Sequence, residues 1–396
     1  MRLFAFGSNG SGQLALGHKE DVSSPTQCLF SSPTIPDDEI IHMAAGGNHT
    51  LLLTKRGCVY AAGCNSDGRC GPTPSTAYDE STGSVDKDDL LRFRRVLLTD
   101  ETGLPVEFFK CVSATWEGSV LVALNKENED RIFVLGSSPK GELGLGSGVS
   151  SAMNGMSLSL SLPPGTSITA LASGMGHSVA VTSNGDVLGW GGARKGQLGD
   201  SLKGQKIVWT PAKVEGIPFR ATAAVCGREF TVIVGQREAG EFMVLGDRGN
   251  RWGILNVPSL GGMGYSDIGA SWHGIYVHIA PEAGNSKAPV IAWGRDDRGQ
   301  LPPPRLPEPV QVAVGSEHVL ALLEGGEVAT FGWGEHGNCG PDTDEKGECG
   351  RHVQFGFVAG FCARCWCEGR WCWSWMCDKL VEREMRSRSE WFNTHF

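Results

Sequence analysis

The sequence predicts an all-β protein, a seven-bladed β-propeller whose N- and C-terminal segments share one blade. Two recurring patterns and a strand-like composition support this prediction. Glycine supplies 56 of the 396 residues, about twice its usual share of roughly 7 %, and such an excess directs attention to internal repeats. Apolar stretches of four to six residues are bounded by Gly, Asn, Asp or Pro, and helical periodicity is nowhere sustained.

The first pattern is a short apolar stretch followed by glycine, four residues, a second glycine, two residues and often a third glycine. The copy at Gly246 is weakened, because Arg251 stands where the second glycine belongs. The pattern occurs seven times, with its first glycine at Gly7, Gly63, Gly136, Gly191, Gly246, Gly294 and Gly332.

The second pattern lies between consecutive copies of the first and consists of two apolar stretches around a small turn. Hairpins such as TSNGDVL and LEGGEVA join it to the next first pattern, and their Asn-Gly and Gly-Gly pairs supply the positive φ of tight turns. Each repeat therefore forms a sheet of about four strands, and radial stacking buries the faces of the sheets. The six copies lie at 41–53, 109–124, 168–181, 221–234, 265–279 and 310–323.

The copy numbers predict how the ring closes. Seven first patterns meet six second patterns, and the chain opens on a first pattern at Leu3. The C-terminal segment must therefore supply the inner hairpin of the first blade. We assign residues 1–340 to the propeller, with long peripheral loops at 72–95 and 146–167.

The remaining segment, 341–396, is a Cys/Trp-rich tail that departs from the repeat. Cys362 and Cys365 have the spacing of half a zinc site, but the second pair is absent, so we predict no metal site. We expect the tail to be poorly ordered, or to result from a retained intron or a shifted reading frame. Its stretch 352–363 offers at most one strand toward closing the ring.

Charge and composition exclude several classes of function. The net charge of −9 argues against nucleic-acid binding. A run of about 18 apolar residues, which a membrane span needs, is absent from the sequence, and the uneven cysteine distribution suggests a reducing compartment, the cytoplasm or also the nucleus. We recognise no catalytic set, and because no helix is expected after the glycine-rich strings, we predict no nucleotide or other cofactor.

The doublet of G-x4-G-x2-G and an apolar-Gly-x-x-His-apolar turn resembles the regulator of chromosome condensation repeat over residues 1–340. That resemblance implies a seven-bladed propeller. The stretches FGWGEHGNCGP at 331–341 and VGSEH at 314–318 are similar to one branch of the family. This branch holds the fungal alpha-tubulin suppressors, which are also the killer-toxin-insensitivity partners of the small zinc protein of diphthamide synthesis.

The resemblance implies a non-enzymatic adaptor that binds the small zinc-binding protein of diphthamide synthesis. Through this partner it would support diphthamide formation on elongation factor 2 and, indirectly through Elongator, modification of tRNA wobble uridine. We expect a monomer or a one-to-one heterodimer without direct contact to nucleic acid or membrane. The alternative is a guanine nucleotide exchange factor for a small GTPase, the activity of the family's founding member.

The turns of the second pattern should lie on one face of the disc near its axis, where Trp and Arg are the residue types that dominate partner binding. His49, His177 and His318 share one position after the turn glycine, and we expect their imidazoles to bond the backbone of a neighbouring blade. The last first pattern adds a second candidate group. The predicted partner-binding residues are Trp116, Glu117, Arg228, Glu229, Trp272, His273, Glu317, His318, Trp333, Glu335 and His336.

Overall fold

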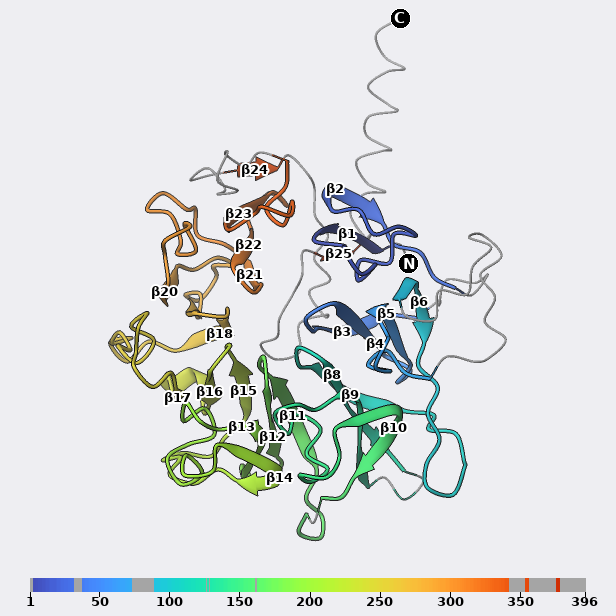
Figure 1. Cartoon of the computed structure of the whole chain (residues 1–396). Coiled ribbons are helices and arrows are strands. Elements are labelled where there is room, and N and C mark those ends of the chain that lie inside the picture. Colours follow the sequence, from blue (N-terminus) through green and yellow to red (C-terminus); the bar gives the residue numbers. More distant parts are fainter. Residues whose placement is uncertain are drawn as a thin grey trace, which may run out of the picture.

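Short antiparallel strands build seven sheets that are arranged as a ring around a central axis in the computed structural model (Figure 1). The only helical element among the described residues is a single 3₁₀ turn, η1 (Arg237–Ala239). The prediction of an all-β propeller with seven blades is confirmed. The structure describes residues 3–31, 38–72, 89–125, 127, 129–160, 162–341, 353–355 and 375–377.

We number the sheets as blades 1 to 7 in chain order. Blade 1 combines β1 (Leu3–Gly7) and β2 (Val22–Gln27) with β25 (Trp375–Cys377). The other strands are β3 (Ile40–Ala45), β4 (His49–Thr54), β5 (Val59–Cys64) and β6 (Asp89–Arg95) in blade 2; β7 (Phe109–Ala114), β8 (Gly118–Leu124), β9 (Asp130–Ser137) and β10 (Ser151–Leu158) in blade 3; β11 (Ile168–Ser173), β12 (His177–Thr182), β13 (Val187–Gly192) and β14 (Ile207–Lys213) in blade 4; β15 (Ala223–Cys226), β16 (Phe230–Val234) and β17 (Phe242–Gly246) in blade 5; β18 (Tyr265–Ala270), β19 (Gly274–Ile279) and β20 (Val290–Gly294) in blade 6; and β21 (Gln311–Val314), β22 (His318–Leu322), β23 (Val328–Gly332) and β24 (Val353–Phe355) in blade 7.

The ring closes in blade 1, where β25 pairs antiparallel with β1 and Leu3 lies opposite Cys377. The first and last described segments therefore share a blade, as the copy numbers predict. The closing strand is not in the stretch 352–363, because β24 within that stretch pairs with β23 and completes the outer edge of blade 7. Most of the tail, 341–396, lies outside the described residues, so the expectation that it is poorly ordered stays a prediction.

Two segments that we expected to be long loops contain strands. Asp89–Arg95 form β6 and Ser151–Leu158 form β10, each the fourth strand of its blade. An outermost strand pairs on one side only and leaves much of its surface in water, so its sequence need not be apolar. Residues 73–88 of the first loop lie outside the described residues.

Blades 5 and 6 contain three strands in the described part of the chain, whereas blades 2, 3, 4 and 7 contain four. Proline explains the difference in blade 6, because it has no N–H to donate to a strand ladder. The segment that follows β20 contains Pro302, Pro303, Pro304, Pro307 and Pro309.

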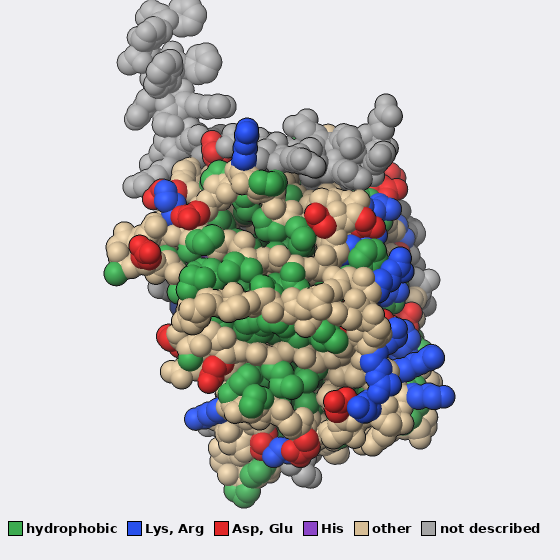
Figure 2. All heavy atoms as spheres, turned by 90° about the vertical axis from the view of Figure 1, so that its left-hand side faces the viewer, with side chains coloured by type: hydrophobic (Ala, Val, Ile, Leu, Met, Phe, Trp, Pro, Cys, Tyr) green, Lys and Arg blue, Asp and Glu red, His purple; other side chains and the backbone are tan. Residues whose placement is uncertain are grey.

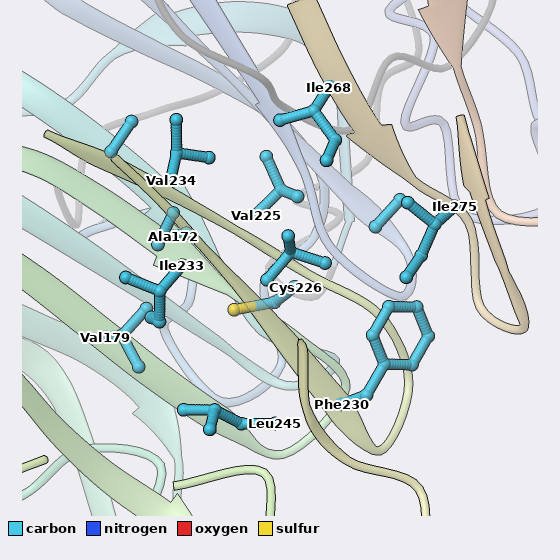
Figure 3. Close-up of a cluster of buried hydrophobic side chains, with 14 of the residues drawn as sticks. Ala172, Val179, Val225, Cys226, Phe230, Ile233, Val234, Leu245, Ile268 and Ile275 are labelled. Atoms are coloured by element: carbon cyan, nitrogen blue, oxygen red, sulfur yellow. The ribbon is translucent and has the colours of Figure 1, made fainter. Parts of the chain in front are cut away.

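The core lies between the faces of neighbouring blades. Figure 3 shows Val179 of blade 4, Val225 and Ile233 of blade 5, and Ile268 and Ile275 of blade 6 in one buried cluster. Because the inner strands are covered on both faces, most of their residues are apolar or small on both faces. This packing makes the ring a rigid platform for the loops at its two faces.

The first glycine of each first pattern, which we call the anchor glycine, has a φ between +95° and +128°. At Gly191, a Cβ atom would lie 2.6 Å from the carbonyl oxygen of Gly176, which directly precedes the paired strand β12. Both the backbone conformation and the lack of space therefore require glycine there. The anchor ends the third strand and sends the chain into the next loop.

His49 of blade 2 is fastened to blade 3. Its Nε2 lies 2.9 Å from the hydroxyl oxygen of Ser119, and that hydroxyl donates to the carbonyl oxygen of Arg69 at 2.7 Å. Since the single hydroxyl proton of Ser119 goes to Arg69, Nε2 of His49 must be the donor in their contact. A Cβ atom on Gly46 would lie 2.1 Å from the imidazole, which explains the Gly-x-x-His spacing.

His177 of blade 4 makes the same contact with blade 5. Its Nε2 lies 2.9 Å from Thr231 Oγ1, which donates to the carbonyl oxygen of Gln197 at 2.7 Å. We predicted a bond to the backbone of the neighbouring blade. The backbone of Phe230 in blade 5 does interact with the imidazole and opposes the lowering of its pKa by burial. The contact with the Thr231 hydroxyl, which reaches back to a carbonyl of blade 4, was not predicted.

The buried histidines make stability dependent on pH. Burial lowers the pKa of His49 to about 3 and the pKa values of His177 and His318 to about 4, whereas an unfolded histidine titrates near 6.5. Between these values the unfolded chain binds more protons, so the stabilisation is complete above pH 6.5 and is lost as the pH falls toward 4. We expect each histidine to cost about 1.4 kcal/mol per pH unit in this window.

Urea unfolding at pH 5.0, 5.5, 6.0 and 6.5 measures this effect. The His177→Gln variant removes one titrating group, so its free energy of unfolding should fall less steeply with decreasing pH, by about one proton. The Asn48→Gln variant changes an exposed amide and removes no titrating group, so it provides the control and should keep the wild-type slope. Equal slopes for the His177→Gln variant and the wild type would contradict the assignment.

Candidate functional site

Each of blades 2 to 7 presents two loops on the same face of the disc. The residue that begins the second strand lies opposite the anchor glycine that ends the third, as in His177 opposite Gly191 and Phe230 opposite Gly246. The turn between the first two strands and the loop after the third strand therefore leave the blade at the same end. We call this surface the tip face; its inner turns are 46–48, 115–117, 174–176, 227–229, 271–273 and 315–317.

The inner turns converge on the axis. The rings of Trp116 from blade 3 and Trp272 from blade 6 have centroids 5.5 Å apart. Turn residues of five blades line a pocket of about 40 Å³ there, which is far below the several hundred Å³ of a typical small-molecule site. The axial end of the tip face therefore offers no cavity of the size that a small molecule needs, and the role of these turns in partner binding stays a prediction.

Backbone hydrogen bonds hold neighbouring turns in place. The N–H of Arg228 donates to the carbonyl of Trp272 at 3.1 Å, and the N–H of Trp272 donates to Ser316 at 2.9 Å. On the other side of the axis, the N–H of Trp116 donates to Met175 at 3.1 Å. Both axial tryptophans are therefore positioned by their own backbones, which limits the entropy lost when a partner binds.

Nine of the predicted partner-binding residues reach the surface of the tip face, and two do not. Glu317 is 5 % exposed and His318 is 1 % exposed, so neither can contact a partner directly. His318 is buried because the Gly-x-x-His turn directs the imidazole into the blade interface. The residues that are exposed or half-buried are Trp116, Glu117, Arg228, Glu229, Trp272, His273, Trp333, Glu335 and His336.

Glu317 organises a buried polar cluster under the tip face. Its carboxylate accepts hydrogen bonds from Arg295 at 3.0 Å and Gln300 at 2.9 Å, and His273 Nδ1 lies 3.4 Å away. Burial alone would raise the pKa of Glu317, but the bonds from His273 and Gln300 and the charge of Arg295 hold this pKa below its usual value. Glu317 therefore positions Arg295 and His273 and does not bind the partner itself.

Three residues of the tip face, Arg251, Trp252 and Arg295, were not predicted from the sequence. The guanidinium carbon of Arg251 lies 4.7 Å from the centre of the Trp252 ring, that of Arg295 lies 5.1 Å from it, and the His273 ring is 6.0 Å away. Arg251, Trp252 and Arg295 belong to the outer loops that follow the anchor glycines of blades 5 and 6, whereas His273 belongs to the predicted inner turn of blade 6. The repeat pattern could have identified them, because antiparallel pairing brings the outer loops to the same end of each blade as the predicted inner turns.

A second stack joins blades 6, 7 and 1. The guanidinium carbon of Arg298 lies 4.3 Å from the centre of the Trp333 ring and Arg298 reaches Glu335 at 4.0 Å. The His336 ring is 6.0 Å from Trp333, and its Nδ1 lies 2.9 Å from a carboxylate oxygen of Asp21 in blade 1. The predicted group of Trp333, Glu335 and His336 is thus a set of contacts between blades as well as a surface.

Within the described ranges, no group of three or more His, Cys, Asp or Glu side chains is arranged to hold a metal ion. No described helix is long and apolar enough to cross a membrane. The chemistry that the tip face offers is therefore that of half-buried tryptophans stacked with arginines, the residue types that contribute most to protein interfaces.

Comparison with known proteins places this geometry in a family. A model of the regulator of chromosome condensation (RCC1) repeat matches residues 2–53 and 184–234, and a second model of that repeat matches 40–69, 168–197 and 310–338. An RCC1 repeat-containing protein of Schizosaccharomyces pombe is 31 % identical over 344 residues, which cover 86 % of this chain and 90 % of that protein. The chain belongs to the RCC1 repeat family.

Other family members are more distant. The secretion-regulating guanine nucleotide exchange factor of mouse is 26 % identical over 388 residues, which cover 87 % of this chain and 76 % of that protein. Among solved structures, Prp20p of Saccharomyces cerevisiae, described together with its binding to Gsp1p and histones, matches with a TM-score of 0.71 at 17 % identity, over 98 % of this chain and 95 % of that one. At this identity the likeness shows the RCC1-type fold alone.

Proposed function

We propose that this RCC1-type propeller is a non-catalytic protein that binds one small partner protein on its tip face. The observation that carries the proposal is the set of half-buried tryptophans, Trp116, Trp252, Trp272 and Trp333, held at one face by backbone bonds and arginine stacks. A rigid aromatic surface with little room for a small molecule fits a protein partner.

We further propose that the partner is the small zinc protein of diphthamide synthesis, and that the pair acts in the cytoplasm or nucleus. In this role the propeller supports diphthamide formation and, through Elongator, modification of tRNA wobble uridine. The support for this partner is the likeness of the stretches 314–318 and 331–341 to fungal alpha-tubulin suppressors. Both stretches contribute to the tip face. The first contains the inner turn 315–317, and the second contains Trp333 and Glu335.

Size-exclusion chromatography of the purified proteins tests this proposal. We expect the propeller and the small zinc protein to elute as a one-to-one complex, with a dissociation constant in the micromolar range or below. The separate elution of both proteins at concentrations of tens of micromolar would refute this partner. A zinc protein stripped of its metal serves as the control for a folded partner.

The second candidate is a guanine nucleotide exchange factor for a small GTPase. The relative from mouse is named for this activity, and Prp20p is described with Gsp1p. Release of fluorescent GDP from a panel of small GTPases distinguishes the candidates. Fast release without a zinc-protein complex would favour the exchange factor, and background release with a complex would favour the adaptor.

A further inference from the structure

Four arginines on the tip face form no ion pair with any residue in the described ranges. They are Arg194 in the outer loop of blade 4, Arg228 in the inner turn of blade 5, and Arg248 and Arg251 in the outer loop of blade 5. Arg194, Arg248 and Arg251 are exposed and Arg228 is half-buried. We call these four residues the basic sector.

The basic sector is one continuous surface. The N–H of Arg248 donates to the carbonyl of Lys195 at 3.2 Å, so the outer loops of blades 4 and 5 touch. The guanidinium of Arg228 lies 5.6 Å from the centre of the Trp272 ring, and Arg251 lies over Trp252. In Figure 2, which faces the rim from the side of β17 and β20, Lys and Arg side chains gather along the right-hand edge.

Four other cations of the tip face, Lys195, Arg298, Arg295 and Arg69, are paired with carboxylates. Lys195 lies 3.4 Å from Glu229, and Arg298 lies 4.0 Å from Glu335. Arg295 is held by two carboxylates, and Arg69 of blade 2 is held by Asp67 at 2.8 Å. The basic sector therefore places four guanidiniums without an ion-pair partner in the described ranges over blades 4 and 5, although the charge of Arg248 already acts on Asp200. The chain as a whole carries a net charge of −9.

We propose that the basic sector binds an acidic segment of the partner protein, whose Asp and Glu carboxylates pair with Arg194, Arg248 and Arg251 beside the stacked tryptophans. This inference deepens the proposed function and rests on it. Exposed guanidiniums bind carboxylates through two parallel hydrogen bonds, and the adjacent tryptophans exclude water from these bonds. The sector also accelerates the approach of an acidic partner at low salt.

A protein segment fits this surface better than a nucleic acid does. A nucleic acid would meet the overall negative charge of the chain and the carboxylates of Glu229, Asp297 and Glu335 that border the sector. Trp252 already carries the guanidiniums of Arg251 and Arg295, so it is not a free platform for stacking bases. An acidic peptide can bind through the guanidiniums of the basic sector alone.

A charge-reversal pair tests the inference. The variant Arg248→Glu/Arg251→Glu is compared with Arg56→Glu/Arg220→Glu, which makes the same change of net charge at exposed arginines outside the tip face. We expect the affinity for the small zinc protein at 50 mM salt to fall about 30-fold or more in the first variant and to stay within about two-fold in the second. Wild-type affinity should weaken with rising salt, and the first variant should lose most of this dependence.

A second probe separates this inference from the choice of partner. A synthetic peptide of alternating Glu and Gly residues should bind the wild type and the control variant at low salt, and not the Arg248→Glu/Arg251→Glu variant. If all three proteins bind the peptide equally, or none does, the inference is wrong even if the zinc protein forms a complex. A tRNA transcript that binds more tightly than the peptide and depends on the same arginines would overturn it in favour of nucleic acid. If the zinc protein fails to bind while the peptide result holds, only the proposed partner is refuted.

Discussion

The Gly191→Ala variant is expected to unfold at a melting temperature about 4 °C below that of the wild type. Gly191 has a φ of +95°, and an alanine Cβ would lie 2.6 Å from the carbonyl oxygen of Gly176 and 2.8 Å from the Cα of His177. The backbone strain and the displaced ladder together cost about 3 kcal/mol. Differential scanning calorimetry at pH 7.5, where the buried histidines do not titrate, measures the change.

Gly204→Ala is the matched control for this experiment. Gly204 belongs to the same blade, but it has no positive φ and nothing lies within 4 Å of a Cβ added there. Its melting temperature should stay near the wild-type value or rise slightly, because alanine restricts the unfolded chain. Equal melting temperatures for the two variants would show that the anchor glycines are not what fixes the turn at the end of each third strand.

Trp272→Ala is expected to weaken partner binding by about 30-fold or more, which corresponds to about 2 kcal/mol. Trp272 contacts the Trp116 ring across the axis and the Arg228 guanidinium beside it, so its loss opens the centre of the tip face. Isothermal titration calorimetry with the small zinc protein measures the affinity. Circular dichroism of the variant checks that the sheets remain folded.

Trp209→Ala is the control for the loss of a tryptophan. Trp209 lies in β14, the outermost strand of blade 4, where it neighbours Gly141 of blade 3. This variant should lose some stability while keeping the wild-type affinity. If Trp272→Ala binds as tightly as Trp209→Ala and wild type, the partner does not use the centre of the tip face.

Most of the fold could be predicted because glycine and apolar residues mark every inner strand. The second patterns at 168–181 and 310–323 correspond to the pairs β11–β12 and β21–β22. The anchor glycine Gly332 ends β23, and Gly191 lies one residue before the end of β13. Outer strands could not be recognised in this way. Ser151–Leu158 pair through their backbone while several of their side chains stay in water, so their sequence carries little apolar signal.

The candidate site was predicted in part. The inner turns supplied Trp116, Arg228 and Trp272, because the repeat itself places those turns near the axis. The sequence could not show that the carboxylate of Glu317 turns inward, since this depends on Arg295 and Gln300 from another segment. Local patterns identify the turn that carries a residue, but a side chain's direction depends on contacts between blades.

The pairing of β1 with β25 has a consequence for the order of events during synthesis. Leu3 is translated before the strands of blades 2 to 7, whereas its partner Cys377 is translated after them. Until then β1 carries an unpaired edge to which any exposed strand can add. Because contacts of such large sequence separation form slowly, this edge stays open to pairing with other strands until the circle is complete.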